Sequence, residues 1–107
     1  MYADYIRERS NDIIIEDETG FIQFRFLNEK QVFIVELYVL PEFRRSGLGS
    51  KLADRVVAFA KIQGCVELLA AVWVESKNSK ISILSCIGYG MLPYGTSGES
   101  LLFRKEI

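Results

Sequence analysis

The first third of the chain alternates between apolar runs and polar turns. Residues 13–15 are all β-branched, and residues 21–27 alternate so that Ile22, Phe24 and Phe26 share one face. β-Branched residues and a two-residue alternation both favour extended backbone. The pattern therefore predicts two strands joined as a hairpin by the acidic turn between them.

The next apolar run is longer and ends abruptly. Residues 32–40 are apolar at every position except Glu36, which is typical of a central strand covered on both faces. Pro41 ends this strand, because proline cannot donate to a sheet and biases Leu40 toward extended backbone. A carboxylate inside such a strand needs an explanation.

Apolar residues then return at helical spacing from Ser46 to Gln63. The stripe expected to face the sheet consists of Leu48, Leu52, Val56, Phe59 and Ala60. Gly64 fits the C-terminal cap of this helix. Residues 66–74 form a second apolar strand, and a strand reached through a crossover helix is expected to lie parallel to the strand before it.

The C-terminal third predicts one more helix and a second hairpin. Residues 79–87 have helical spacing, and residues 91–94 and 101–105 form short strands around a loop at residues 95–99. The helix side chains expected to face the sheet are Ile81, Leu84 and Ile87. A further short helix is expected at residues 2–9.

A basic, glycine-rich turn, Pro41–Ser50, lies between the long strand and the first long helix. Such a turn leaves N–H groups unpaired at the start of the helix, where the helix dipole adds partial positive charge. Gly47 and Gly49 allow a ligand to approach the main chain, and Arg44 and Arg45 add full charges. The turn therefore predicts a phosphate site, and the alternative is an ordinary turn with two solvated arginines.

The amino-acid composition limits the kinds of partner that the chain is expected to bind. The 107 residues predict a single domain over residues 1–107, and a net charge of −1 argues against nucleic acid or an anionic membrane as a partner. The chain has no histidine, which removes the Ser-His triad and most zinc sites, so no metal is expected. Cys65 and Cys86 are expected to be free thiols. No apolar run reaches the roughly 18 residues of a membrane span, and no signal peptide is recognised, so a cytoplasmic location is expected.

The order of strand, Pro41–Ser50 turn, amphipathic helix and buried strand resembles the GNAT superfamily of N-acetyltransferases. The signature of that family is Arg or Gln, two variable residues, Gly, one variable residue, then Gly or Ala, and Arg44, Gly47 and Gly49 match it. The resemblance implies an α/β fold of the α+β type. Its sheet would be mixed and mostly antiparallel, flanked by helices, with a parallel central strand pair joined by a crossover helix.

The same resemblance implies acetyl-coenzyme A as the cofactor. The residues that would surround its pyrophosphate are Arg44, Arg45, Ser46, Gly47, Leu48, Gly49 and Ser50. Main-chain groups of Leu37, Tyr38 and Val39 would bind the pantetheine arm, and one of their N–H groups would polarise the thioester carbonyl. Asn78 would contact the cofactor at the start of the second helix, although it is one residue out of register with the strictest family pattern.

The implied mechanism is direct attack of a neutral amine on the thioester. A carboxylate suffices to take the proton from the ammonium, and Glu36 is the candidate general base. The alternative is a structural ion pair of Glu36 with an arginine such as Arg25. Relatives carry a tyrosine acid at the position of Leu84, so Tyr89 is the replacement candidate, with Tyr94 as another.

The leading functional hypothesis is an N-acetyltransferase acting on a primary amine of a small molecule or a protein. The alternative is a non-catalytic module that binds coenzyme A or acyl-coenzyme A. A nucleotide-binding domain is disfavoured, because the third glycine of G-x-G-x-x-G would fall at Leu52. The acceptor-binding helices of relatives are reduced here to residues 1–9, so either the acceptor is small or lies on an open surface, or a second subunit of a homodimer completes the pocket near Trp73.

Overall fold

The computed structural model describes residues 12–107, and its framework is one six-stranded sheet. The strands are β1 (Ile13–Asp17), β2 (Gly20–Phe26), β3 (Gln31–Val39), β4 (Glu67–Trp73), β5 (Leu92–Ser97) and β6 (Ser100–Glu106). The helices are α2 (Leu48–Ile62) and α3 (Ser79–Gly88), with a 3₁₀ turn, η1, at Pro41–Phe43. The helix predicted at residues 2–9 lies outside the described residues.

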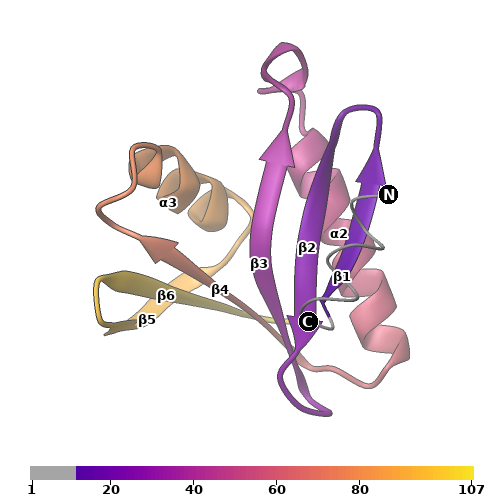
Figure 1. Cartoon of the computed structure of the whole chain (residues 1–107). Coiled ribbons are helices and arrows are strands. Elements are labelled where there is room, and N and C mark those ends of the chain that lie inside the picture. The colour runs from indigo at the N-terminus through magenta and orange to yellow at the C-terminus, as the bar shows by residue number, and fades with distance from the viewer. Residues whose placement is uncertain (1–11) are drawn as a thin grey trace.

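The strands lie in the order β1-β2-β3-β4-β6-β5, so β3 and β4 are central (Figure 1). β3 pairs with β4 in parallel, and every other neighbouring pair is antiparallel. The chain reaches β4 from β3 through α2. The expected fold class is confirmed. Neither helix within residues 12–107 has the length and apolar character needed to cross a membrane.

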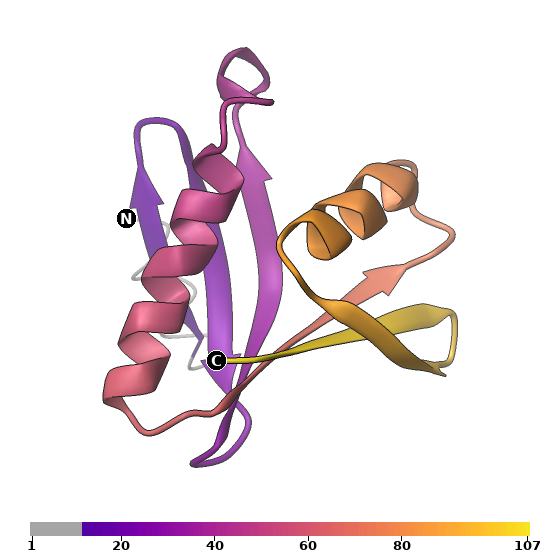
Figure 2. The same cartoon turned by 180° about the vertical axis from the view of Figure 1, so that it is seen from behind.

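The core lies between α2 and the first three strands, which α2 crosses in the view of Figure 2. Ile22 and Phe24 are fully buried, as the alternation predicts. The other core side chains come from α2, β3, β4, β6 and the short connections before β4 and β5, and the largest of them are Val32, Val56, Leu68, Met91 and Phe103. Phe59 is partly exposed, but its ring contacts those of Phe24 and Phe26.

The predicted inner face of α3 is wrong. Ile81, Leu84 and Ile87 are 66%, 59% and 50% exposed, whereas Ile83 and Cys86 pack against the core. Apolar residues occur on several sides of this short helix, so spacing alone selects no face. The contact with β4 selects the Ile83 face instead.

Some element boundaries also differ from expectation. α2 begins at Leu48 instead of Ser46, because the preceding residues form η1 and a turn. Strands β5 and β6 extend to a tight turn at Gly98 and Glu99, which replaces the longer loop predicted at residues 95–99. Gly64 follows α2 with φ +95°, and its N–H donates to the Lys61 carbonyl, which confirms the predicted cap.

Candidate functional site: the notch between β3 and β4 and the turn beside it

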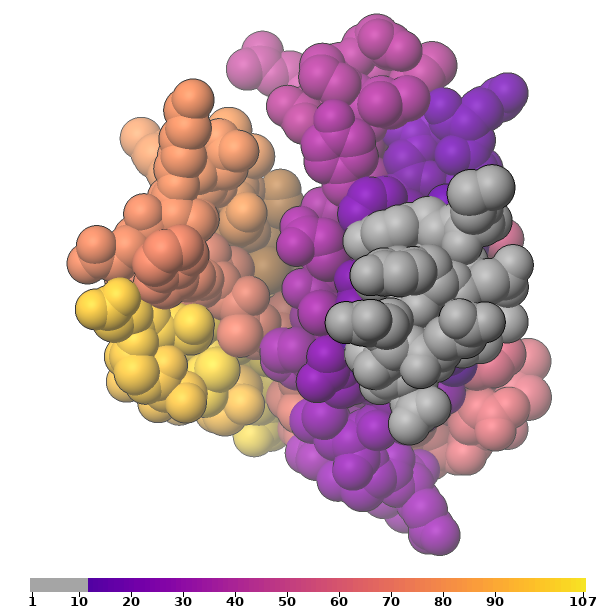
Figure 3. Space-filling view, viewed as in Figure 1, coloured from indigo at the N-terminus to yellow at the C-terminus, as the bar shows by residue number. Residues whose placement is uncertain are grey.

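The two parallel strands are paired only over their first halves. The pairing runs from Gln31 with Glu67 to Ile34 with Ala70, and beyond this point the strands diverge (Figure 1). We call the space between residues 35–39 of β3 and residues 71–73 of β4 the notch. In the space-filling view the surface is hollowed between the β3 side of the molecule and the part formed by β4 and α3 (Figure 3). Main-chain groups at the edge of a strand are therefore open to a ligand there.

Main-chain groups of β3 point into the notch at alternate residues. The Leu40 N–H donates to the Thr19 carbonyl at 2.8 Å, toward the β2 side. Since a trans peptide is planar, the Val39 carbonyl points the opposite way, into the notch. Main-chain direction alternates along a strand with a period of two residues. The main-chain groups of Leu37 therefore also point into the notch, and those of Tyr38 point toward β2. Two of the three predicted pantetheine contacts, Leu37 and Val39, thus have main-chain groups directed into the notch.

A β-bulge decides where Glu36 points. Gln23 of β2 pairs with Glu36, but the next residue, Phe24, pairs with Ile34, so Val35 is an extra residue in β3. Val32 and Ile34 face the core, and without the bulge Glu36 would follow them. The extra residue reverses the alternation, so Glu36 is exposed on the face of the sheet opposite α2.

The predicted alternative of an ion pair between Glu36 and Arg25 is wrong. Arg25 instead pairs with the buried Asp12, with Nε 2.9 Å from Oδ1 and Nη2 donating to Oδ2 at 2.9 Å. Gln23, directly opposite Glu36 in the sheet, also donates to Asp12 Oδ2 at 2.7 Å. Within the described residues Glu36 makes no side-chain hydrogen bond or ion pair, and it lies two residues beyond Ile34, where the pairing with β4 ends.

The Pro41–Ser50 turn is held by local contacts. After η1 the chain passes through Arg45, whose φ of +63° is unusual for a residue with a side chain. The Ser46 hydroxyl donates to the Phe43 carbonyl. Gly47 has φ +81° and is the N-cap of α2. Both left-handed residues turn the chain sharply from the end of β3 into the helix.

The start of α2 offers unpaired main-chain donors. The first N–H of the helix with a partner in its own chain is that of Lys51, which donates to the Gly47 carbonyl at 3.1 Å. Within residues 12–107 the N–H groups of Leu48, Gly49 and Ser50 have no such partner, and no side chain caps the helix. A Cβ added at Gly47 would meet no atom within 4 Å, and one at Gly49 would meet only Leu37 Cδ2, at 3.6 Å. Open space therefore adjoins the free donors.

The two arginines of the turn lie differently. Arg44 Nε donates to the Val39 carbonyl at 2.9 Å, and its guanidinium carbon lies 5.5 Å from the centre of the Tyr38 ring. That ring stacks on Phe21 with 5.9 Å between centroids. Arg45 is exposed and makes no side-chain hydrogen bond or ion pair within the described part of the chain. Sequence reasoning missed the aromatic stack, because Phe21 and Tyr38 are brought together only by strand pairing.

Tyr89, the predicted acid, follows α3 and reaches α2. Its hydroxyl donates to Asp54 Oδ1 at 2.6 Å. Burial raises the pKa of Tyr89 well above its ordinary value, and the hydrogen bond and the negative charge of Asp54 raise it further. Asn78 is exposed at the N-terminal end of α3, and its side chain makes no capping hydrogen bond. Tyr94 is exposed on β5.

Both cysteines are free, as predicted. Burial raises the pKa of Cys65, which the positive charge of Lys30 lowers in part, and burial also raises the pKa of Cys86. A raised pKa keeps a thiol protonated at neutral pH and therefore a weak nucleophile.

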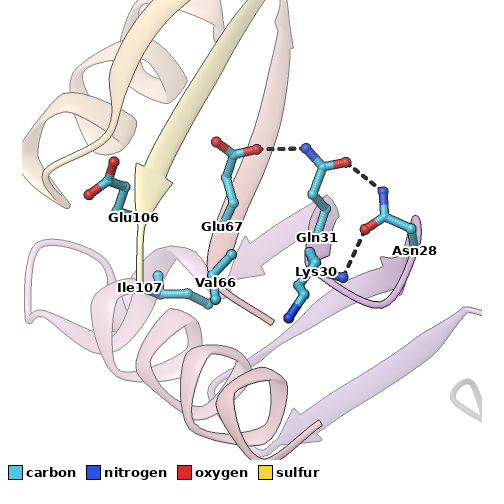
Figure 4. Close-up of a pocket in the computed structure, with 7 residues that line it drawn as sticks. All are labelled: Asn28, Lys30, Gln31, Val66, Glu67, Glu106 and Ile107. Atoms are coloured by element: carbon cyan, nitrogen blue, oxygen red, sulfur yellow. Dashed lines mark hydrogen bonds between the residues drawn. The ribbon is translucent and has the colours of Figure 1, made fainter. Parts of the chain in front are cut away.

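An open pocket of about 670 Å³ lies at the other end of the parallel strand pair (Figure 4). Three of its polar side chains bond to one another: Asn28 Nδ2 donates to Gln31 Oε1 at 2.7 Å, and Gln31 Nε2 donates to Glu67 Oε1 at 2.6 Å. Here β3 and β4 are fully paired, so no main-chain edge is open. We therefore place the candidate site at the notch instead.

The fold and the notch define a class of protein. The family model described as "Acetyltransferase (GNAT) family" matches residues 2–81. The chain belongs to this family, which confirms the resemblance inferred from Arg44, Gly47 and Gly49.

Two curated relatives are acetyltransferases of amines. Aminoglycoside N(6')-acetyltransferase type 1 from Acinetobacter genomosp. 13 is 34% identical over 62 residues, covering 54% of this chain and 42% of the relative. Thialysine N-epsilon-acetyltransferase from Sus scrofa is 27% identical over 77 residues, covering 72% of this chain and 45% of the relative. The matched segment spans less than half the length of each of these relatives.

Among solved structures, the PaiA N-acetyltransferase of Thermoplasma acidophilum in complex with coenzyme A superposes with a TM-score of 0.78. The two share 19% sequence identity, and the match covers 95% of this chain and 66% of the other. At this identity the likeness concerns the fold, which the two proteins share across nearly all of this chain.

Proposed function

We propose that this chain binds acetyl-coenzyme A at the notch and transfers its acetyl group to the nitrogen of a primary amine. The observation that carries the proposal is the junction of the open edge of β3 with the free N–H groups at the start of α2. The open edge of β3 suits an extended arm that contains amide groups, and the free N–H groups at the start of α2 suit an anion. Family membership and the coenzyme A bound to the Thermoplasma protein support the same ligand.

The residues present fit this cofactor. The pyrophosphate would lie against the N–H groups of Leu48, Gly49 and Ser50, beside Gly47, where a side chain would find only open space. Arg45 adds a positive charge there that has no ion-pair partner within residues 12–107. The pantetheine arm would bind the main chain of Leu37 and the N–H of Val39 along the notch, because the Val39 carbonyl already accepts from Arg44 Nε. Asn78, at the start of α3, remains a proposed contact on the opposite side.

Acetyl-coenzyme A supplies an acetyl group activated as a thioester. The exposed Glu36 carboxylate takes a proton from the acceptor ammonium, directly or through water, and leaves a neutral amine with a free electron pair. A main-chain N–H directed into the notch, at Leu37 or Val39, donates to the carbonyl oxygen as negative charge develops there. The amine nitrogen forms the new C–N bond and loses its second proton to water, the C–S bond breaks, and the thiolate that leaves accepts a proton.

The donor of that last proton is the less defined part of the proposal. Tyr89 is the proposed acid, but its hydroxyl donates to Asp54 Oδ1 and its raised pKa opposes release of the proton. The residue at the family's tyrosine position, Leu84, cannot donate a proton. These two observations favour a second candidate function, a module that binds coenzyme A or acyl-coenzyme A without turnover.

A thiol-release assay separates the two functions. Purified protein is incubated with acetyl-coenzyme A and a panel of amines, including aminoglycosides, lysine analogues and peptides, and free thiol is measured over time. We expect release that depends on one class of amine and on Glu36. Binding of coenzyme A without release above the background rate would support the non-catalytic module. Absence of coenzyme A binding would refute both.

The acceptor is proposed only as a primary amine, of a small molecule or a protein. Trp73 is 56% exposed, and its indole Nε1 donates to Glu99 Oε2 at 3.1 Å. This exposed aromatic side chain is compatible with a second subunit, so the homodimer stays a prediction that measurement of the solution mass would test. The cytoplasmic location also stays a prediction.

A further inference from the structure

Arg44 and Arg45 are adjacent in the Pro41–Ser50 turn, but they make different contacts. Arg44 places its Nε–H on the Val39 carbonyl at 2.9 Å, and its guanidinium lies over the Tyr38 ring. Both contacts are with the end of β3. The side chain therefore connects the turn to the strand edge that borders the notch.

Arg45 makes no comparable contact. Within residues 12–107 its side chain has neither a hydrogen bond nor an ion pair, and its main chain has the unusual φ of +63°. A residue with a side chain persists in this conformation only where the surrounding chain requires it. The contacts of Arg44 and Ser46 on either side supply that requirement.

We propose that the two arginines have different roles in cofactor binding, an inference that rests on the proposed function. Arg44 is a positioning residue: it holds the turn against β3 so that the free N–H groups of α2 and the notch face one ligand. Arg45 supplies the positive charge that neutralises the pyrophosphate. Position 44 thus requires a donor at the ε atom, whereas position 45 requires a charge.

Covalent geometry makes this distinction testable. The Nε of arginine and the Nε2 of glutamine are separated from Cα by the same number of bonds, so glutamine can place an N–H on the Val39 carbonyl without any charge. Lysine keeps the charge, but it has a carbon at the ε position and its donor is one bond farther away. Methionine has a side chain of similar length, but it offers neither an N–H donor nor a positive charge.

The experiment measures the dissociation constant of coenzyme A by calorimetry for Arg44→Gln, Arg44→Lys, Arg44→Met and Arg45→Gln. We expect Arg44→Gln to stay within about threefold of the unsubstituted protein, because it keeps the hydrogen bond to the Val39 carbonyl and loses the exposed charge and its contact with Tyr38. Arg44→Lys and Arg44→Met each lose a charge-assisted hydrogen bond and should bind about tenfold more weakly. Thermal unfolding of each variant shows that the fold is kept.

Salt dependence gives a readout that a structural role alone would not change. Between low and high salt, the affinity of the unsubstituted protein should fall, because screening weakens an exposed charge pair. Arg45→Gln should reduce this dependence, and Arg44→Gln should preserve it. Tyr38→Leu, which removes the aromatic face under Arg44, should weaken binding by about two- to fivefold, and by less in the Arg44→Met background.

The opposite order would overturn the inference: Arg44→Lys binding like the unsubstituted protein while Arg44→Gln binds as weakly as Arg44→Met. That result would assign Arg44 a role as a charge. Equal binding by all three Arg44 variants would assign it no role. A failure of the unsubstituted protein to bind coenzyme A would refute the proposed function itself, so the two failures are distinguishable.

Discussion

Gly47 offers the sharpest test of the proposal that the Pro41–Ser50 turn binds an anion, because its backbone conformation and the space beside it can be tested with different substitutions. Its φ is +81°, and a Cβ there would meet no protein atom within 4 Å. Any loss of stability on substitution must therefore come from the backbone. Any loss of binding that remains in a stable variant must come from the space beside the helix.

The size of the backbone effect follows from the chirality of the residue. A residue with a Cβ in the left-handed region costs about 1–2 kcal/mol, so Gly47→Ala should lower the melting temperature by about 4–8 °C in a domain of this size. Asparagine tolerates this region much better, so Gly47→Asn should keep stability within about 0.5 kcal/mol. Gly47→Val adds β-branching and should be the least stable of the three.

The affinity for coenzyme A should rank the variants in a different order from their stability. Gly47→Asn keeps the fold but places a side chain where the pyrophosphate would lie, so we expect its affinity for coenzyme A to fall at least about tenfold. Gly49→Ala is the matched control: its Cβ meets only Leu37 Cδ2, at an ordinary 3.6 Å, and the family signature accepts alanine there. It should keep its affinity and gain up to about 0.5 kcal/mol from higher helix propensity.

Thermal unfolding monitored by circular dichroism and calorimetric titration with coenzyme A measure both quantities on the same samples. A stable Gly47→Asn variant that binds coenzyme A as tightly as the unsubstituted protein would refute the placement of the ligand at this turn. Unchanged stability of Gly47→Ala would refute the backbone argument.

Three further predictions concern ionisable groups. Glu36→Gln should lower kcat about 100-fold while coenzyme A affinity is kept, and an unchanged rate would exclude Glu36 as the base. Tyr89→Phe removes the hydrogen bond to Asp54 and should cost about 1 kcal/mol of unfolding free energy; if turnover survives, Tyr89 has a structural role and another group protonates the thiolate. Hydrogen bonds from Thr19 lower the pKa of Asp17 below its ordinary value of 3.8. The ionised form of Asp17 therefore stabilises the fold when the pH is above this ordinary pKa. This stabilisation is lost as the pH falls through the lowered pKa of the folded state. Asp17→Asn should therefore be less stable than the unsubstituted protein at about pH 7, and the two should converge near about pH 2 in thermal unfolding, whereas a constant difference would contradict this linkage.

Much of the fold could be predicted because its signals are local. The alternation in β2, the helical stripe of α2 and the proline after β3 each depend on a few consecutive residues, and all three elements occur as expected. The Pro41–Ser50 turn was predictable for the same reason, since two glycines, two arginines and a helix start follow one another in the chain. The face of α3 was predicted wrongly, because its apolar residues do not form a single stripe.

The candidate site depends on contacts between distant residues. The ion pair that removes Arg25 from Glu36 joins residues 13 positions apart, and the bond between Tyr89 and Asp54 joins residues 35 apart. No local pattern encodes which carboxylate an arginine meets. The Arg44 contact with Val39 spans only five positions, but it requires the turn to fold back on the strand end.

The sequence alone determined the six strands and the helices α2 and α3, their order and the chemical character of the Pro41–Ser50 turn, because short-range periodicity and backbone preferences act along the chain. The tertiary structure decided the rest. The extra residue Val35 shows only in the pairing of β2 with β3, and it directs Glu36 away from α2. The notch exists because β3 and β4 pair over their first halves and then diverge. Where two strands stop pairing depends on the elements that pack against each of them, which are distant in the sequence.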